Sequence, residues 1–228
     1  MPSYKAPLDD YRFLLFDFFR VQEQKDLPGY ADIDPETVMA ALEGGAKLCE
    51  EVLQPLNQAG DENGCTFENG VVRTPPGFKA AYDAYYAGGW SALGWPESMG
   101  GAGLPPVVTL LMTEMCNAAN QSLSMYFGLT SAACGALQGF GLPWMREHIV
   151  PKLLDGTWGG TMCLTEPHCG TDLKLMKTKA VEQSDGSYRM SGTKIFISGG
   201  DHDMAGNIIH MVIAKIPDAD GKLRDDLG

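Results

Sequence analysis

Apolar residues recur at intervals of three and four through the first two thirds of the chain, which is the spacing of helices with one buried face. The first such stretch begins at Leu8 and ends before Pro28-Gly29. Its predicted inner face consists of Leu8, Tyr11, Leu15, Phe18 and Phe19. We therefore expect the chain to open with a helix that packs against others.

Further helices follow. Asp34-Pro35-Glu36 combines an N-cap, a proline at the first helical position and an acid in the first turn, so a helix is expected from there towards Asn57. Pro55 is expected to end or kink it. Residues 60–70 are predicted to form a polar loop. Later helices are expected over 78–90, from Pro105-Pro106 through Cys116, over 124–140, and then to Leu154.

The pattern changes after Asp155-Gly156 to that of β-strands. Strands are predicted over 159–165 and 208–216. Between them, segments 177–183 and 188–198 flank Asp185-Gly186, and Asp-Gly between alternating segments is a strong hairpin signal. A run of helices followed by a run of antiparallel strands is typical of an α+β fold. We expect an all-helical domain over 1–156 and the first part of a β-domain over 157–228, which stops after about four strands, within the turn-like stretch Arg224–Gly228.

Charge and cysteine usage narrow the class of protein. The 228 residues include 29 acids and 17 bases, a net charge of −12, and have no large basic cluster, so nucleic-acid binding is not expected. The six cysteines form no Cys-x-x-Cys pair and are interpreted as reduced thiols. Leu8–Arg20 is interrupted by charges and too short to span a membrane. A cytoplasmic protein is expected.

Residues 161–172, TMCLTEPHCGTD, bring several reactive side chains together. Glu166, His168 and Cys169 are close in sequence with Cys163, but their spacing matches no common zinc pattern, so no metal is predicted. Cys169 could be a nucleophile with His168 as its base. Adjacent side chains usually point apart, however, and a loop cysteine without chemistry is the simpler interpretation.

A wall for a cofactor is the remaining interpretation. Thr165 and Thr171 offer hydroxyls, and Gly170 allows a ligand to approach the main chain closely. A strand predicted over Thr193–Ser198 would place Phe196 and Ser198 on one face, where a ring and a hydroxyl could meet the cofactor. An aromatic residue at a strand position is more often part of the core.

Three motifs resemble those of the acyl-CoA dehydrogenases, in the family's order and spacing. TMCLTEPHCGTD resembles the signature M-x-L-T-E-P-x-x-G-S/T-D, and GTKIFISGG resembles the second signature, G-x-K-x-W/F-I-S/T-x-G. ALGWPESMGGAGLP is similar to the loop L-G-x-P-E-x-x-G-G-x-G that precedes the family's central helices. The opening YKAPLDDYRFLLFDFF resembles the extended start of a larger subgroup, which includes 3-methylmercaptopropionyl-CoA dehydrogenase-like proteins.

The resemblance implies an N-terminal helical domain, a middle β-domain and a C-terminal helical bundle, with FAD held at the β-domain of a homo-oligomer. It implies that Phe196 packs on the flavin ring, that Ile197 and Ser198 line its edge, and that Thr171 lies near the CoA moiety and the flavin diphosphate. The residues implied to bind the cofactor are Met162, Leu164, Thr165, Gly170, Thr171, Phe196, Ile197 and Ser198.

The implied reaction is oxidation of an acyl-CoA to the trans-2-enoyl-CoA, with electrons passed to a partner. The family's catalytic base is a glutamate in the C-terminal domain, expected beyond residue 228, so no catalytic residue is assigned here. Glu166 belongs to the signature turn and is expected to make structural hydrogen bonds. His168-Cys169 replaces the Gly-Ala that is frequent in the signature, which leaves the substrate open.

We therefore expect an N-terminal portion of such an enzyme, inactive alone. Two alternatives stay open. The chain could be a relative of the acyl-CoA oxidases, which share the same signatures. It could also be a non-catalytic subunit that binds a second chain carrying the missing strands and helical bundle.

Overall fold

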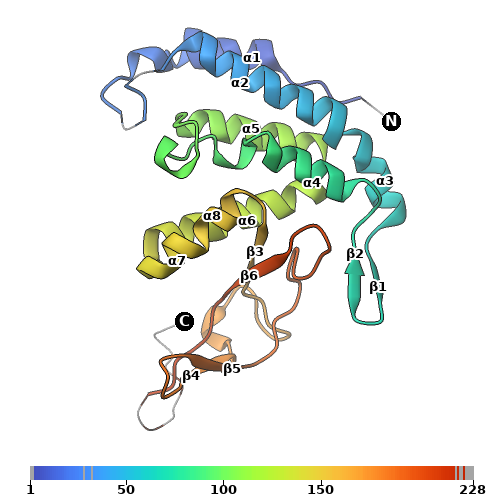
Figure 1. The fold of residues 1–228 in the computed structure, drawn as a ribbon, viewed down its shortest axis with the longest axis vertical. Coiled ribbons are helices and arrows are strands. Elements are labelled where there is room, and N and C mark those ends of the chain that lie inside the picture. Colours follow the sequence, from blue (N-terminus) through green and yellow to red (C-terminus); the bar gives the residue numbers. More distant parts are fainter. Residues whose placement is uncertain (1–2, 28, 32, 219, 221–222, 224–228) are drawn as a thin grey trace.

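A computed structural model describes residues 3–27, 29–31, 33–218, 220 and 223. Its helices lie in successive layers, with the strands beyond the last layer (Figure 1). α1 (Leu8–Arg12) and α2 (Pro35–Leu48) form the outer layer, and α4 (Phe78–Ala87) and α5 (Pro106–Ala119) lie beneath it. The remaining helices are α3 (Pro55–Asn63), α6 (Gln121–Phe140), α7 (Pro143–His148) and α8 (Val150–Leu154). None of the helices in the described part of the chain is both long and apolar enough to cross a membrane.

Two side chains cap the helices that organise these layers. The Asp34 carboxylate accepts a hydrogen bond from the Thr37 backbone N–H at 2.9 Å, which confirms the predicted start of α2. The Asn120 side chain accepts from the Leu123 N–H at 3.1 Å, so α6 begins at Gln121, slightly earlier than predicted. Asn120 is buried and also donates to the carbonyl of Leu53 at 3.1 Å, which joins α6 to the outer layer.

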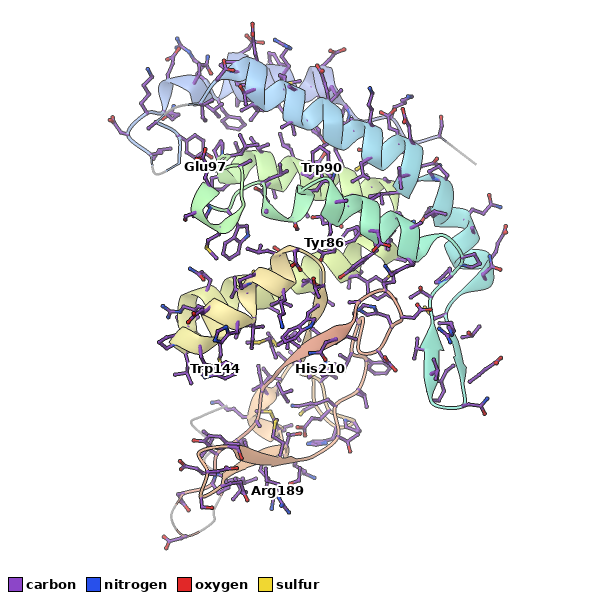
Figure 2. The ribbon with its side chains drawn as sticks, viewed as in Figure 1. Tyr86, Trp90, Glu97, Trp144, Arg189 and His210 are labelled. Atoms are coloured by element: carbon purple, nitrogen blue, oxygen red, sulfur yellow. The ribbon has the colours of Figure 1, made fainter. Side chains whose placement is uncertain are left out.

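The helical core is apolar and continuous from α1 to α6. Its fully buried members include Leu42, Leu53, Val108, Met115 and Leu123. Figure 2 shows Tyr86 and Trp90 among the packed helices, whereas Arg189 lies on the hairpin farthest from them. A second apolar cluster joins α6 to α8 and to the strands. Burial of this kind follows the helical period that the sequence shows.

Two details near the beginning differ from the prediction. Phe18 and Phe19 are exposed, Phe18 by 64%, although Tyr11 and Leu15 are buried as expected. A π-helical turn over Phe13–Phe18 explains the difference, because a wider turn rotates later residues away from the original face. A similar turn over Cys49–Leu53 carries α2 into α3, so of the two predicted effects of Pro55 the ending of the helix is wrong: Pro55 is the first residue of α3.

Residues 60–70, predicted to form a loop, consist largely of helix and strand. α3 continues to Asn63, and β1 (Thr66–Glu68) then pairs with β2 (Val71–Arg73) as an antiparallel hairpin. Asn69 and Gly70 between them both have positive φ, at 53° and 79°. Asn-Gly is the preferred pair for such a tight turn, so the sequence contained a hairpin signal that was overlooked.

The strand region contains one predicted hairpin and one unexpected pair. β4 (Lys179–Glu182) and β5 (Tyr188–Ser191) form the antiparallel hairpin. β3 (Trp158–Cys163) pairs with β6 (Asn207–Val212), but in parallel, so the expected antiparallel direction was wrong for this pair. The whole segment 164–206 serves as the crossover. The α+β fold class is confirmed, and the stretch Arg224–Gly228 lies outside the described residues.

β3 is seated directly on α6. A side chain at Gly160 would place its Cβ 2.7 Å from the Cβ of Ala133, so only glycine allows this approach. The Gly160 N–H also donates to the Thr130 hydroxyl at 3.0 Å. This contact sets the position of the loop that leaves the end of β3.

Candidate cofactor-binding site

The first signature begins on β3 and continues into a tight turn over Glu166–Cys169. The Glu166 N–H donates to the Cys169 carbonyl at 2.8 Å, and the Cys169 N–H donates to the Glu166 carbonyl at 3.1 Å. Pro167 and His168 lie exposed at the tip, whereas the Glu166 side chain is only 3% exposed. The turn therefore directs a carboxylate inward.

The Glu166 carboxylate is held by several donors. It accepts from the N–H of Lys177 at 2.8 Å, from the N–H of Thr178 at 2.9 Å and from the Lys194 ammonium at 3.0 Å. Burial opposes the charged form, but these donors outweigh it and lower the pKa of Glu166 from 4.5 to about 2. The contacts agree with the expected structural role of Glu166.

The second signature segment lies beside the first. The Ile195 N–H donates to the Thr165 carbonyl at 2.9 Å, and the Lys194 ammonium donates to the Leu164 carbonyl at 2.9 Å. Residues 164–165 and 194–195 are thus joined by main-chain acceptors. The sequence predicted that both segments contribute to one site, and the structure does place them side by side.

The predicted strand over Thr193–Ser198 is wrong. β5 ends at Ser191, and Gly192 lies so near Thr178 that a Cβ there would be 2.2 Å from its hydroxyl oxygen. Phe196 then adopts a positive φ of 57°, which no strand residue has, so Phe196 and Ser198 do not share a strand face. The Phe196 side chain is 89% exposed and is therefore not part of the core.

The other predicted site residues line the same turn and strand end. Met162 is 38% exposed, although Thr161 and Cys163 on either side are buried. Leu164, Thr165, Gly170 and Ile197 are half-buried, and Thr171 and Ser198 are exposed. A Cβ at Gly170 would lie 3.2 Å from the Thr165 methyl carbon, so the turn is narrow there.

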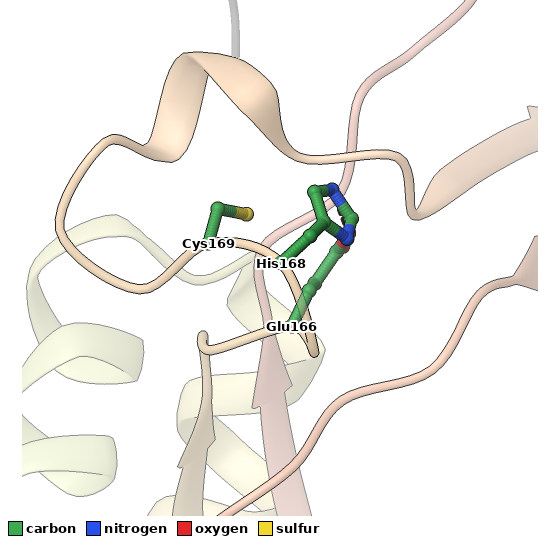
Figure 3. Close-up of side chains that lie close together, drawn as sticks. All are labelled: Glu166, His168 and Cys169. Carbon is green, nitrogen blue, oxygen red and sulfur yellow. Dashed lines mark ion pairs between the residues drawn. The ribbon is translucent and has the colours of Figure 1, made fainter.

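Glu166, His168 and Cys169 do come together in space (Figure 3). Their possible ligand atoms all lie within 4.8 Å of one another. The Glu166 carboxylate already accepts three hydrogen bonds, however, and the Lys194 ammonium beside it opposes a second cation. His168 Nε2 lies 2.9 Å from the Leu175 carbonyl oxygen, which favours neither a metal site nor a dyad with Cys169.

Sequence reasoning missed the residue that connects the two signatures. This residue is Lys194, the lysine of the second signature, whose side chain is 9% exposed. A lysine directly before the apolar run Ile195–Ile197 was the available signal, because a lysine that lies inside the protein requires a partner. Glu166 is that partner.

Comparisons with known proteins agree on the family. Residues 39–157 match the family model of the acyl-CoA dehydrogenase N-terminal domain. The chain is 41% identical over 217 residues to the 3-methylmercaptopropionyl-CoA dehydrogenase of Ruegeria pomeroyi, covering 95% of this chain and 37% of that protein. It therefore spans about a third of this relative's length.

Solved structures show the same fold. Butyryl-CoA dehydrogenase from Megasphaera elsdenii superposes with a TM-score of 0.66 at 24% identity, covering 83% of this chain and 46% of that one. A structure described as the FAD complex of PigA gives 0.64 at 21% identity, covering 82% and 45%. The family model matches more than half of this chain, and this chain therefore belongs to the acyl-CoA dehydrogenase family.

Proposed function

We propose that this chain forms part of the FAD site of an enzyme that converts an acyl-CoA to the trans-2-enoyl-CoA. The observation that carries the proposal is the junction of the two signature segments, where the Ile195 N–H bonds the Thr165 carbonyl beside the exposed ring of Phe196. Membership of the family supports the reaction class.

The exposed groups fit a flat, partly apolar cofactor. Phe196 and Met162 present apolar surface that their neighbours do not cover. Thr165 and Ser198 add hydroxyls, and the carbonyl contacts described above hold both segments in place. The positive φ of Phe196 is an outlier for an aromatic residue, and such strain is concentrated at binding sites. One solved structure with this fold is described as an FAD complex.

Each residue then has a defined task. Bound FAD would accept a hydride from the β-carbon of the thioester. We assign Phe196 to packing on the flavin ring, Ser198 to donating towards its edge and Thr171 to the CoA moiety and flavin diphosphate. Met162, Leu164, Thr165, Gly170 and Ile197 complete the wall. A positioned hydroxyl stabilises the charge that reduction adds to the ring.

Other parts of the enzyme are required for turnover. A general base must remove the α-proton, and no residue of this chain matches the family's base. We propose that a C-terminal helical domain supplies it, that residues 1–156 and 157–228 belong to different domains, and that the enzyme assembles as a homo-oligomer or with a chain that supplies that domain. On its own, this chain would be inactive. An electron-transfer partner would reoxidise the cofactor; rapid reoxidation by dioxygen would favour the oxidase alternative.

A pair of aromatic variants tests the cofactor assignment. Phe196→Ala should weaken FAD binding about tenfold or more, because it removes the stacking surface. Phe140→Ala is the matched control, since Phe140 is 93% exposed at the end of α6, outside the site. FAD affinity is measured by quenching of flavin fluorescence. Equal affinities for Phe196→Ala and the unchanged chain would overturn the assignment.

A further inference from the structure

A buried lysine lies where the two signature segments meet. Lys194 has a side chain that is 9% exposed, and its ammonium donates to three acceptors: the Leu164 carbonyl at 2.9 Å, the Glu166 carboxylate at 3.0 Å and the Met176 sulfur at 3.2 Å. An ammonium has three N–H groups, so these acceptors use its full donor capacity. The lysine is therefore oriented, and not merely enclosed.

The three acceptors belong to three different parts of the loop system. Leu164 lies just after β3, Glu166 lies in the signature turn, and Met176 follows the short helical turn Leu173–Leu175. Lys194 itself belongs to the segment that returns after the hairpin β4–β5. One side chain thus connects both signatures with the intervening chain.

The residues that follow depend on this anchor. Ile195 donates its N–H to the Thr165 carbonyl, and Phe196 comes next with its positive φ of 57°. A non-glycine residue keeps such a conformation only where its surroundings hold it there. Because the Phe196 side chain is exposed, the restraint comes from the backbone on both sides of it. Lys194 and Ile195 attach the preceding residues to the first signature, and a turn closed by the Gly200 N–H and the Ile197 carbonyl at 3.0 Å follows.

We propose that Lys194 is a positioning residue: it holds the two signature segments at the separation that the proposed cofactor site requires. Its ammonium donates to the main-chain carbonyl of Leu164, and we assign it no contact with the flavin: it acts through Leu164, Thr165 and Phe196. The consequence for FAD rests on the proposed function. The holding of the two segments together rests only on the contacts described here.

Charge and geometry can be separated by a double variant. Lys194→Met keeps a chain of similar length but leaves the buried Glu166 carboxylate without its cation. Glu166→Gln/Lys194→Met removes both charges, yet the Leu164 carbonyl and the Met176 sulfur still lack their donor. Lys179→Met is the control, because Lys179 is an exposed lysine on β4.

The experiment compares amide hydrogen exchange, without FAD, in peptides that cover 164–178 and 193–200 with exchange in peptides from α2 and α5. Lys194→Met should speed exchange in both loop peptides about tenfold or more, as expected when charge-assisted hydrogen bonds are lost, and leave the helices unchanged. FAD should bind about tenfold more weakly or worse. The double variant should fold but keep both defects, and Lys179→Met should match the unchanged chain.

Two results would overturn the proposal. Unaltered exchange in both loop peptides of Lys194→Met is the first. The second is recovery of loop protection and FAD affinity in the double variant, which would reduce Lys194 to a counter-ion. An FAD affinity of the assembled enzyme that Phe196→Ala leaves unchanged would instead overturn the proposed function, and the exchange comparison, made without FAD, would still decide the role of Lys194.

Discussion

The helical layers and the strand region are held together by different forces. Between α1 and α6 the interior is a continuous set of apolar side chains, buried at helical intervals. Beyond β3 the hairpin β4–β5 is largely exposed, and the loops depend on the buried pair Glu166–Lys194 with its carbonyl and N–H partners. Apolar packing tolerates substitutions that conserve volume, whereas a polar network requires every partner. The proposed site thus lies where even conservative substitutions are expected to matter.

The largest effect is expected in the helical core. Leu42→Ala should lower the free energy of unfolding by about 4 kcal/mol, because Leu42 is fully buried and would leave a cavity. Leu110→Ala, at an exposed position on α5, should change it little. Urea denaturation followed by circular dichroism measures both. Similar losses in the two variants would contradict the conclusion that apolar burial holds the helical layers together.

Glu166→Gln should cost the strand region about 3 kcal/mol at neutral pH, since it leaves the Lys194 ammonium buried without its partner. The pKa of Glu166 is lowered from 4.5 to about 2, so its ionised form stabilises the fold above pH 4.5. That contribution is lost as the pH falls from 4.5 towards 2.

Acid titration of loop stability, followed by hydrogen exchange, tests this dependence. The difference between Glu166→Gln and the unchanged chain should shrink across that range, whereas the effect of Leu42→Ala should not. Glu182→Gln, on the exposed hairpin, is the control. A difference that stays constant down to pH 2 would contradict the ionic account of the loops.

Changes at the contact between β3 and α6, where the two regions meet, should have an intermediate effect on stability. Gly160→Ala should cost about 2 kcal/mol, because its new Cβ would lie 2.7 Å from Ala133 and force β3 away from α6. Gly135→Ala, on α6 with open space around it, should instead stabilise slightly. Thermal unfolding of the two variants provides the comparison, and equal shifts would mean that the strand is not seated as described.

The smallest effect is expected at a polar contact within the helical region. Asp34→Ala should lower the denaturation midpoint by less than any of the three changes above, through loss of the cap on α2. Asp34→Asn keeps an acceptor and should retain most of the stability. Denaturation midpoints measure both. If Asp34→Ala were as costly as Glu166→Gln, polar contacts would matter equally in both regions and the contrast would fail.

Sequence patterns predicted the helical part well because periodic burial and helix caps depend on residues that are close together in the sequence. Asp34 and its helix are an example, and Asn69-Gly70 shows that even a missed hairpin had a local signal. The local sequence around Lys194 signals only that the lysine needs a partner, and that around Phe196 gives no signal of its backbone conformation. The position of Lys194 depends on an acceptor set from distant segments, and that of Phe196 on a backbone angle that no strand pattern contains.

The motifs identified the two segments of the proposed site, but not how they are joined. A strand was expected over 193–198 because its residues alternate, yet the close approach of Gly192 to Thr178 turns the chain out of the hairpin first. Tertiary contact thus outweighed local preference. The resemblance supplied the family, and the structure supplied the lysine that connects its two signatures.

The parallel pairing of β3 with β6 has a consequence for folding as well as for shape. It closes residues 164–206 into a single ring of chain whose two ends are joined by the strand ladder. Closing a loop costs conformational entropy, and a contact between two residues within the loop shortens the segment that can still move. The hydrogen bonds of Lys194 are such contacts, and a ligand that binds both signatures would add others. Ligand binding should therefore slow the opening of the strand ladder at β6, which pairs with the first residues of the first signature on β3.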